Sequence, residues 1–175
     1  MGIKGGILGI GNVLQQDDGI GVKVLKYLEA NFIFPDDVEL IDGGTTGAGL
    51  DIAIFGKEWM IVLDALEVSG DPGEVKLICG EDFLSKPSGI RMTPHQVGFL
   101  DQIQLLALEG NGPTHVDLIG VIPKEIDFLP TLSPEVEASM DKVVEMLFDW
   151  LKKKDIVPER RSSPQPPDYW WLPVE

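Results

Sequence analysis

The sequence predicts an α/β fold in which helices cover both faces of one central sheet. Short apolar runs of the kind that form buried strands alternate with longer segments whose apolar residues recur at helical spacing. Glycine-rich turns follow the first two of these apolar runs. The length of 175 residues suits one domain with a full hydrophobic core.

The first half of the chain divides into strands and helices by this alternation. Residues 4–9 predict a buried strand, and the next helix is expected from about Asp18 to Asn31. Its apolar face is formed by Ile20, Val24, Leu28 and Phe32. After it we expect a strand over 38–41 that ends at Asp42, a flexible turn over 43–49, a short helix over 50–55 and a central strand over 59–64.

The second half continues the same pattern. We expect a turn over 71–73, strands over 74–78 and 116–122, and a buried strand end at Cys79. The helix over 93–108 has Thr93 as N-cap, Pro94 at its first position, a capping box closed by Gln96, and a buried face of Phe99, Ile103 and Leu106. One last helix is expected to begin at Ser133 and Pro134, with an apolar stripe of Val136, Met140, Val143, Leu147 and Leu151.

The chain divides into a single domain over 1–154 and a tail over 155–175. Five prolines and the aromatic residues Tyr169, Trp170 and Trp171 set the tail apart from the domain. Two interpretations remain open at this point. The tail is either a loosely attached extension without regular structure, or a segment whose aromatic end docks on this protein or on a partner.

Composition excludes several classes of function. The net charge of −15 repels nucleic acid and anionic lipid, and no apolar run reaches the roughly 18 residues that membrane insertion requires. The single cysteine, Cys79, excludes an internal disulfide and is typical of a cytoplasmic protein; no candidate base lies near it in the sequence. Because no surface helix shows a second apolar face, the free protein is expected to be a monomer.

Asp18, Asp64 and His95 are the main candidate functional residues. Each lies at the end of a predicted element, and in open α/β sheets the carboxyl ends of the strands form the ligand-binding rim. Two carboxylates and an imidazole suit a divalent metal with open positions, and they equally suit acid–base catalysis. Near the start of a helix, the ring of His95 is expected to be neutral. One of Asp17 and Asp18 is expected to cap the helix that follows.

Two glycine-rich turns accompany these residues. The first, Gly9-Ile10-Gly11, lacks the later glycine of a dinucleotide fingerprint because Leu14 stands there, so Asn12 is expected only to order the turn. The second, over 43–49, has more glycine than a strand–helix connection needs. It is either a mobile loop or a place where backbone amides approach a substrate peptide.

Four motifs in a fixed order resemble those of the maturation endopeptidases of nickel–iron hydrogenases. They are residues 9–14 leading to Asp17-Asp18-Gly19, then Asp42-Gly43-Gly44-Thr45-Thr46-Gly47, Leu63-Asp64-Ala65 and Thr93-Pro94-His95. The resemblance runs from about Ile7 to Leu151. It implies a three-layer α/β/α sandwich of the phosphorylase/hydrolase-like type on a mixed sheet of about five strands. It also implies a metal site at Asp18, Asp64 and His95.

The resemblance further implies the removal of a short C-terminal peptide from the hydrogenase large-subunit precursor once nickel is in place. Substrate contacts are expected from Asn12, Gly43, Gly44, Thr45 and Gly47. Nickel is expected to arrive with the substrate, although other divalent metals could occupy the site. Two mechanisms remain open: metal-assisted attack by water, and an aspartic-type pair of Asp18 and Asp64. A non-catalytic chaperone that inspects the unprocessed C-terminus for nickel is the alternative function.

Overall fold

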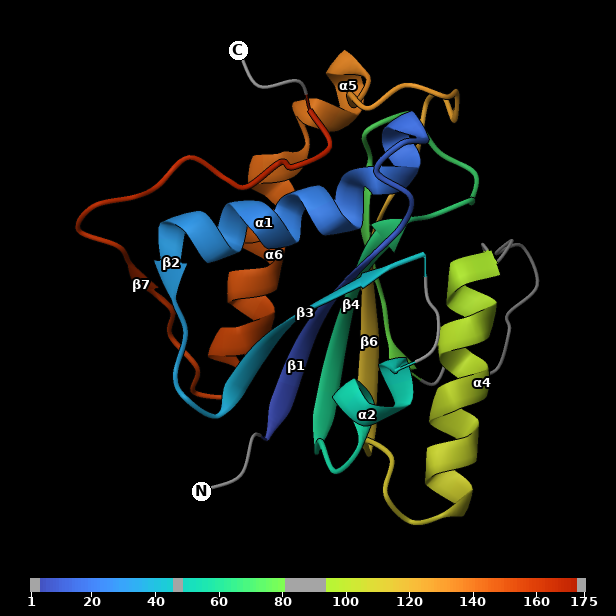
Figure 1. Ribbon diagram of the computed structural model, residues 1–175, viewed down its shortest axis with the longest axis vertical. Helices are drawn as coiled ribbons and strands as arrows, with labels where there is room; N and C mark the ends of the chain where they lie inside the picture. The colour runs from blue at the N-terminus through green and yellow to red at the C-terminus, as the bar shows by residue number, and fades with distance from the viewer. Residues whose placement is uncertain (1–3, 46–48, 81–93, 173–175) are drawn as a thin grey trace.

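The protein is a three-layer α/β/α sandwich on a five-stranded mixed sheet, as expected (Figure 1). The computed structural model describes residues 4–45, 49–80 and 94–172. The strands are β1 (Gly5–Ile10), β2 (Phe32–Ile33), β3 (Val38–Gly44), β4 (Trp59–Ala65), β5 (Val75–Ile78), β6 (His115–Val121) and β7 (Glu159–Arg160). The helices are η1 (Gln16–Gly19), α1 (Ile20–Asn31), α2 (Leu50–Ile54), α4 (Pro94–Leu108), α5 (Pro134–Glu137) and α6 (Met140–Lys152).

The central sheet has the strand order β3-β1-β4-β6-β5. Strands β3, β1, β4 and β6 are parallel, whereas β5 pairs antiparallel with β6. The chain therefore leaves β1 for β3 on one side and then crosses to β4 on the other side. Such a reversal of strand order opens a crevice at the carboxyl ends of the two strands that flank it. That crevice lies between β1 and β4.

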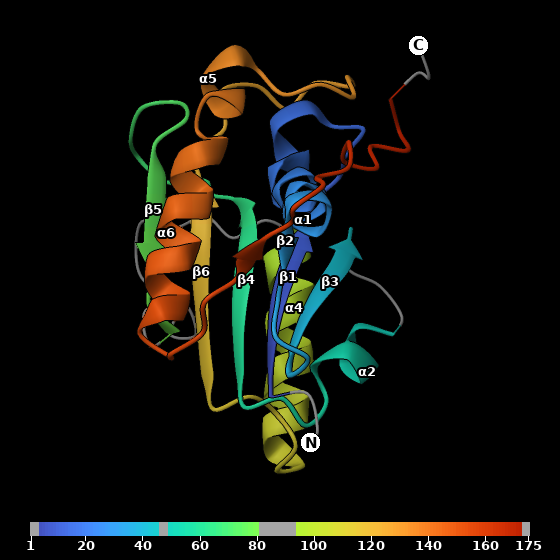
Figure 2. The same ribbon diagram turned by 90° about the vertical axis from the view of Figure 1, so that its left-hand side faces the viewer.

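Each face of the sheet buries its own core, because successive side chains of a strand point to opposite faces. On one face, α1 and α6 pack on residues such as Ile7, Ile61 and Ile119. On the other, α2 and α4 pack on residues such as Leu8 and Val62. Figure 2, which turns the molecule by 90°, shows the helix layers on either side of the strands.

The expected last helix is divided into α5 and α6. Both the amide and the hydroxyl of Ser139 donate to the Val136 carbonyl, at 3.1 and 2.7 Å. In an uninterrupted helix that carbonyl would accept the amide of Met140. The expected stripe is nevertheless buried apart from Met140, which is half-buried.

Two further expectations are wrong. Cys79 is exposed, because β5 ends one residue earlier and is an edge strand with half-buried side chains. Helix α4 does carry a second apolar stripe: Leu105 and Leu108 are exposed, while Phe99 and Ile103 face the core. The premise of the monomer prediction therefore does not hold for α4, and the oligomeric state stays a prediction. Within the described parts of the chain, no helix has the length and apolarity to cross a membrane.

Neither Asp17 nor Asp18 caps a helix, contrary to the expectation. Asp17 instead binds a loop that is distant in sequence and holds it at the start of η1. Its buried carboxylate accepts hydrogen bonds from the amides of Lys124, Glu125 and Ser133 and from the Ser133 hydroxyl, at 2.7–3.1 Å. Four donors compensate for the burial of the Asp17 carboxylate and hold the β6–α5 connection against η1.

We expect Asp17→Ala to lower the free energy of unfolding by about 3 kcal/mol, because four donors lose a charged acceptor at a fully buried site. Urea denaturation monitored by circular dichroism measures the change. The exposed Asp127, in the same loop, provides the matched control. Asp127→Ala should stay within about 0.5 kcal/mol of the wild type. Equal effects of the two substitutions would contradict the role of Asp17.

Candidate active site

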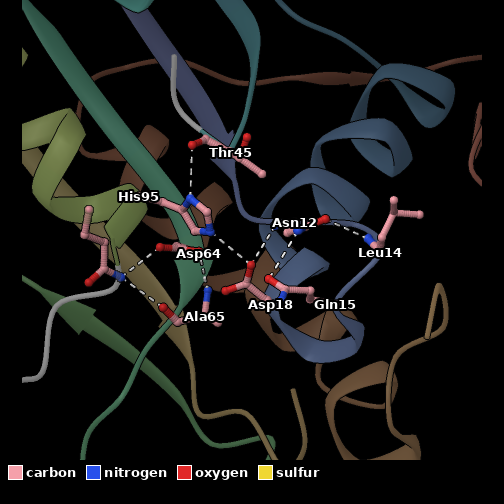
Figure 3. A network of polar contacts seen from close by, with 9 residues as sticks. Asn12, Leu14, Gln15, Asp18, Thr45, Asp64, Ala65 and His95 are labelled. Atoms are coloured by element: carbon pink, nitrogen blue, oxygen red, sulfur yellow. Dashed lines mark hydrogen bonds and ion pairs between the residues drawn. The ribbon is translucent and has the colours of Figure 1, made fainter. Parts of the chain in front are cut away.

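Asp18 lies in η1, directly below the turn that follows β1. Its Oδ2 accepts the backbone amide of Asn12 at 2.7 Å and lies 3.1 Å from Nε2 of His95 (Figure 3). The turn closes tightly because Gly11 has φ 127°, and a Cβ there would collide with the carbonyl oxygen of Asp18. The side chain of Asn12 orders the same turn as expected, since its Oδ1 accepts the amide of Leu14 at 3.0 Å.

Asp64 is the buried acid of the site, with 1% of its surface exposed. It lies next to the last residue of β4, where Oδ1 accepts the Ala65 amide at 2.8 Å and Oδ2 accepts Nε2 of Gln96 at 2.9 Å. Burial raises the pKa of Asp64 well above its ordinary value, and the negative charge of Asp18 raises it further. The two hydrogen bonds and His95 act in the opposite direction without cancelling the effect of burial.

His95 bridges two loops from the first turn of α4. Its Nδ1 lies 3.1 Å from the carbonyl oxygen of Thr45, which only accepts, so Nδ1 carries a proton and Nε2 points to Asp18. The hydrogen bond to Asp18 raises the pKa of His95 above its ordinary value, against the opposing effect of partial burial. The helix dipole led us to expect a shift toward the neutral ring, whereas contact with Asp18 shifts the pKa in the opposite direction.

The three candidate residues thus converge at the crevice between β1 and β4. Asp18 and His95 are in direct contact, and Asp64 is close enough for both to affect its pKa. A metal ion with bond lengths of about 2.1 Å places neighbouring ligand atoms about 3 Å apart. The 3.1 Å between Oδ2 of Asp18 and Nε2 of His95 fits that spacing. Among the described residues, no group of three or more His, Cys, Asp or Glu side chains already forms a metal-binding cluster.

Gln96 is a site residue that the sequence analysis assigned only to helix capping. Its Nε2 donates to Oδ2 of Asp64 and to the carbonyl of Ala65, both at 2.9 Å, and the side chain is fully buried. A signal for this was present in the sequence: Gln96 precedes Phe99 by three residues and Ile103 by seven. It therefore belongs to the buried stripe of α4, where a polar side chain needs a partner.

The second glycine-rich turn has a different structure from the one expected. Gly43 and Gly44 belong to the end of β3, and a Cβ at Gly43 would collide with the side chain of Ile10. The Gly44 amide already donates to Asp42 Oδ1 at 3.1 Å. Thr45 contacts the site through its carbonyl, whereas Gly47 lies outside the described residues. The substrate contacts expected of Asn12 and of this turn stay predictions.

A groove of about 220 Å³ opens beside the Asp18–His95 pair. It is lined by Gly11, Asn12, Val13, Leu14, Val22, Asp42, Gly44, Thr45 and, from the tail, Trp170. Three of these residues also hold the site: Gly11 closes the turn over Asp18, Asn12 donates to it, and Thr45 orients His95. A ligand in the groove would therefore lie next to the candidate catalytic groups.

Two carboxylates and a histidine thus meet at a reversal of strand order beside an open groove, which is where open α/β sheets bind their ligands. The family model of the hydrogenase maturation proteases matches residues 22–150, and the chain belongs to this family. The match includes Asp64 and His95 and leaves out Asp18 and the tail.

Individual relatives agree with this assignment. The hydrogenase 2 maturation protease of Escherichia coli (strain K12) is 32% identical over 151 residues, which cover 86% of this chain and 92% of that protein. The hydrogenase expression/formation protein HoxM of Azotobacter vinelandii is 35% identical over 158 residues, 90% of this chain and 76% of that protein. The solved structure of the hydrogenase maturating endopeptidase HybD from E. coli has a TM-score of 0.84 and 31% identity, covering 91% of this chain and 98% of that one. The chain is therefore a peptidase of the hydrogenase maturation class.

The raised pKa of Asp64 has a consequence for stability. A carboxyl that binds its proton more tightly when folded contributes stability at low pH that is lost as pH rises from the unfolded-state pKa through the folded-state pKa. We expect Asp64→Asn, which cannot ionise, to lose less stability than the wild type between pH 5 and pH 8. Urea denaturation of protein kept in chelator at several pH values measures this. Asp101→Asn, at an exposed position, is the control, and its stability should follow the wild-type dependence on pH. A pH dependence of Asp64→Asn parallel to that of the wild type would contradict the assignment of Asp64 as a buried acid.

Proposed function

We propose that this protein is an endopeptidase that removes the C-terminal extension of a nickel–iron hydrogenase large-subunit precursor after nickel insertion. In this proposal Asp18, Asp64 and His95 recognise nickel that the precursor already holds. The observation that carries it is the pair of Asp18 Oδ2 and His95 Nε2, 3.1 Å apart beside an open groove. Both atoms are donors for a divalent first-row metal, and their separation suits two neighbouring positions on one ion.

The surroundings of His95 support a role in metal recognition. The Thr45 carbonyl accepts a hydrogen bond from Nδ1–H at 3.1 Å and so directs Nε2 toward the site, which is the usual arrangement for a ligating histidine. Contact with Asp18 raises the pKa of His95, so a metal at Nε2 would compete with a proton for that atom. Docking of nickel-loaded precursor would therefore exchange one Asp18–His95 hydrogen bond for two metal bonds.

Asp64 supports the hydrolytic part of the proposal. Asp64 and Asp18 are two buried carboxylates with different neighbours: Asp64 has a raised pKa, whereas Asp18 contacts His95 and the Asn12 amide. Pairs of this kind divide the roles of proton donor and proton acceptor. In the metal-assisted form, substrate-bound nickel makes hydroxide available near neutral pH. In the aspartic-type form, the two carboxylates activate water and nickel serves recognition only. In both, Gln96 fixes the carboxylate of Asp64.

The test is cleavage of nickel-loaded and nickel-free precursor, followed by intact mass. We expect loss of the C-terminal peptide from nickel-loaded precursor only. Asp18→Asn, Asp64→Asn and His95→Ala should each lower kcat/KM by about 100-fold or more, because each removes a metal contact or a proton-transfer group.

Matched controls come from the same chain. His115, the other histidine, begins β6 at the opposite end of the sheet and contacts Asp117 at 3.0 Å. His115→Ala and the exposed-site variant Asp101→Asn should cleave like the wild type. Equal cleavage with and without nickel would reject nickel recognition and favour the aspartic pair. Tight precursor binding without any peptide release would reject the peptidase proposal and favour a nickel-checkpoint chaperone.

A further inference from the structure

The tail is docked along helix α1, and apart from β7 it has little regular structure. β7 pairs antiparallel with β2, the Arg161 amide donates to the Asn31 carbonyl at 2.8 Å, and the Gln165 amide donates to the Ala30 carbonyl at 3.2 Å. These contacts hold the tail at the C-terminal end of α1. From there the tail, drawn in red, runs back beside α1 (Figures 1 and 2).

Tyr169 attaches the aromatic end of the tail to the N-terminal half of α1. Nζ of Lys23 lies 5.4 Å from the centre of the Tyr169 ring, within reach of a cation–π contact. Burial raises the pKa of Tyr169 to about 12, with smaller contributions from Glu137 and Tyr27. Trp171 packs on the same ring, with centroids 5.3 Å apart. Prolines at 164, 166 and 167 stiffen the preceding segment, which lowers the entropy lost on docking.

Docking at Tyr169 brings Trp170 to the groove beside the site. Trp170 lines this groove together with Val13, Leu14 and Val22, yet 67% of its own surface remains exposed. An aromatic side chain with a fixed neighbour on one side and so much free surface offers a large apolar contact to a ligand. The lining also includes the polar residues Asp42, in β3, and Thr45, directly after it.

We propose that Trp170 is a specificity-determining residue, and that it forms with Leu14 a subsite for an apolar side chain of the precursor peptide next to the scissile bond. This inference rests on the proposed function. We infer the occupant because the groove is continuous with the candidate site. Asn12 and Thr45 line the groove and also contact Asp18 and His95, so a peptide cleaved at that pair would extend into the groove. Its side chain meets apolar residues on the tail side, and its backbone runs past the end of the edge strand β3.

The experiment compares Trp170→Ala with the wild type on nickel-loaded precursor, in the full-length chain. We expect KM to rise by about 10-fold with kcat changed by less than about two-fold, because the lost contact lies outside the reacting groups. Trp170→Phe should recover most of the loss, and Leu14→Ala should reproduce it. Phe55→Ala, which removes an exposed aromatic on α2, is the matched control and should leave KM unchanged.

Alanine substitutions along the precursor residues that flank the cut identify the occupant. Alanine at one apolar position of the precursor should raise KM by about 10-fold with the wild-type enzyme. The same substitution should have little further effect with the Trp170→Ala enzyme, since the two changes remove the same contact. Fully additive effects at every position would overturn the subsite. So would an unchanged KM for Trp170→Ala, or a lower KM, which would mean that the tail obstructs the groove.

Calorimetric titration of precursor into each variant separates this inference from the proposed function. If the wild type binds precursor without cleaving it, the peptidase proposal fails, and a roughly 10-fold weaker Kd for Trp170→Ala still supports the subsite. If the wild type cleaves the precursor and Trp170→Ala matches it in both KM and Kd, the subsite fails and the peptidase proposal stands. Absence of both binding and cleavage would overturn the two together.

Discussion

The reversal of strand order around β1 is the constraint on which the site depends. Because β3 and β4 both pair with β1 in parallel, the loop after β1 and the end of β4 must meet at one rim. That meeting places Asp18 beside Asp64, and α4, packed on the sheet face behind them, adds His95 from its first turn. The backbone near the site has positive φ at Gly11, where the turn closes on Asp18, and also at Gln16 in η1 and Gly44 at the end of β3. Positions fixed by a sheet hold catalytic groups more firmly than positions on free loops.

Asp64 lies where burial makes the negative charge of a carboxylate energetically unfavourable. A carboxylate almost excluded from water, with a second carboxylate nearby, is tolerated because the Ala65 amide and Gln96 supply two hydrogen bonds. The arrangement keeps a proton-binding group next to the groove, and a less buried residue would lack its raised pKa. Asp17, one residue from Asp18, has a different role, since it fastens the β6–α5 connection with four hydrogen bonds. Adjacent acids therefore divide structural and site roles.

The tail extends this site with residues from the other end of the sequence. Pairing of β7 with β2 and main-chain hydrogen bonds to α1 carry the chain back to the turn after β1. The family match covers residues 22–150, so both the turn after β1 and the tail side of the groove lie outside it. The tail thereby adds to the groove a residue that is remote in sequence from the candidate site residues.

The sequence by itself determined the layers, nearly all of the element order and the three residues that meet at the rim, because hydrophobic periodicity and the parallel-sheet rule are local or topological signals. It did not determine the break at Ser139, the anchoring role of Asp17, the contact of Gln96 with Asp64 or the exposure of Cys79. The break at Ser139 is local, because both donors of Ser139 bind the carbonyl of Val136 three residues earlier, but hydrophobic periodicity does not reveal it. The other three depend on a partner distant in sequence or on the position of a strand in the sheet, and periodicity carries no such information. The direction of the His95 pKa shift was also not predicted, because the dipole of its own helix can be read locally, whereas the carboxylate of Asp18, 77 residues away, reaches it only in the folded chain. The contacts of the tail with α1 also come from tertiary structure, since they depend on the surface that α1 offers.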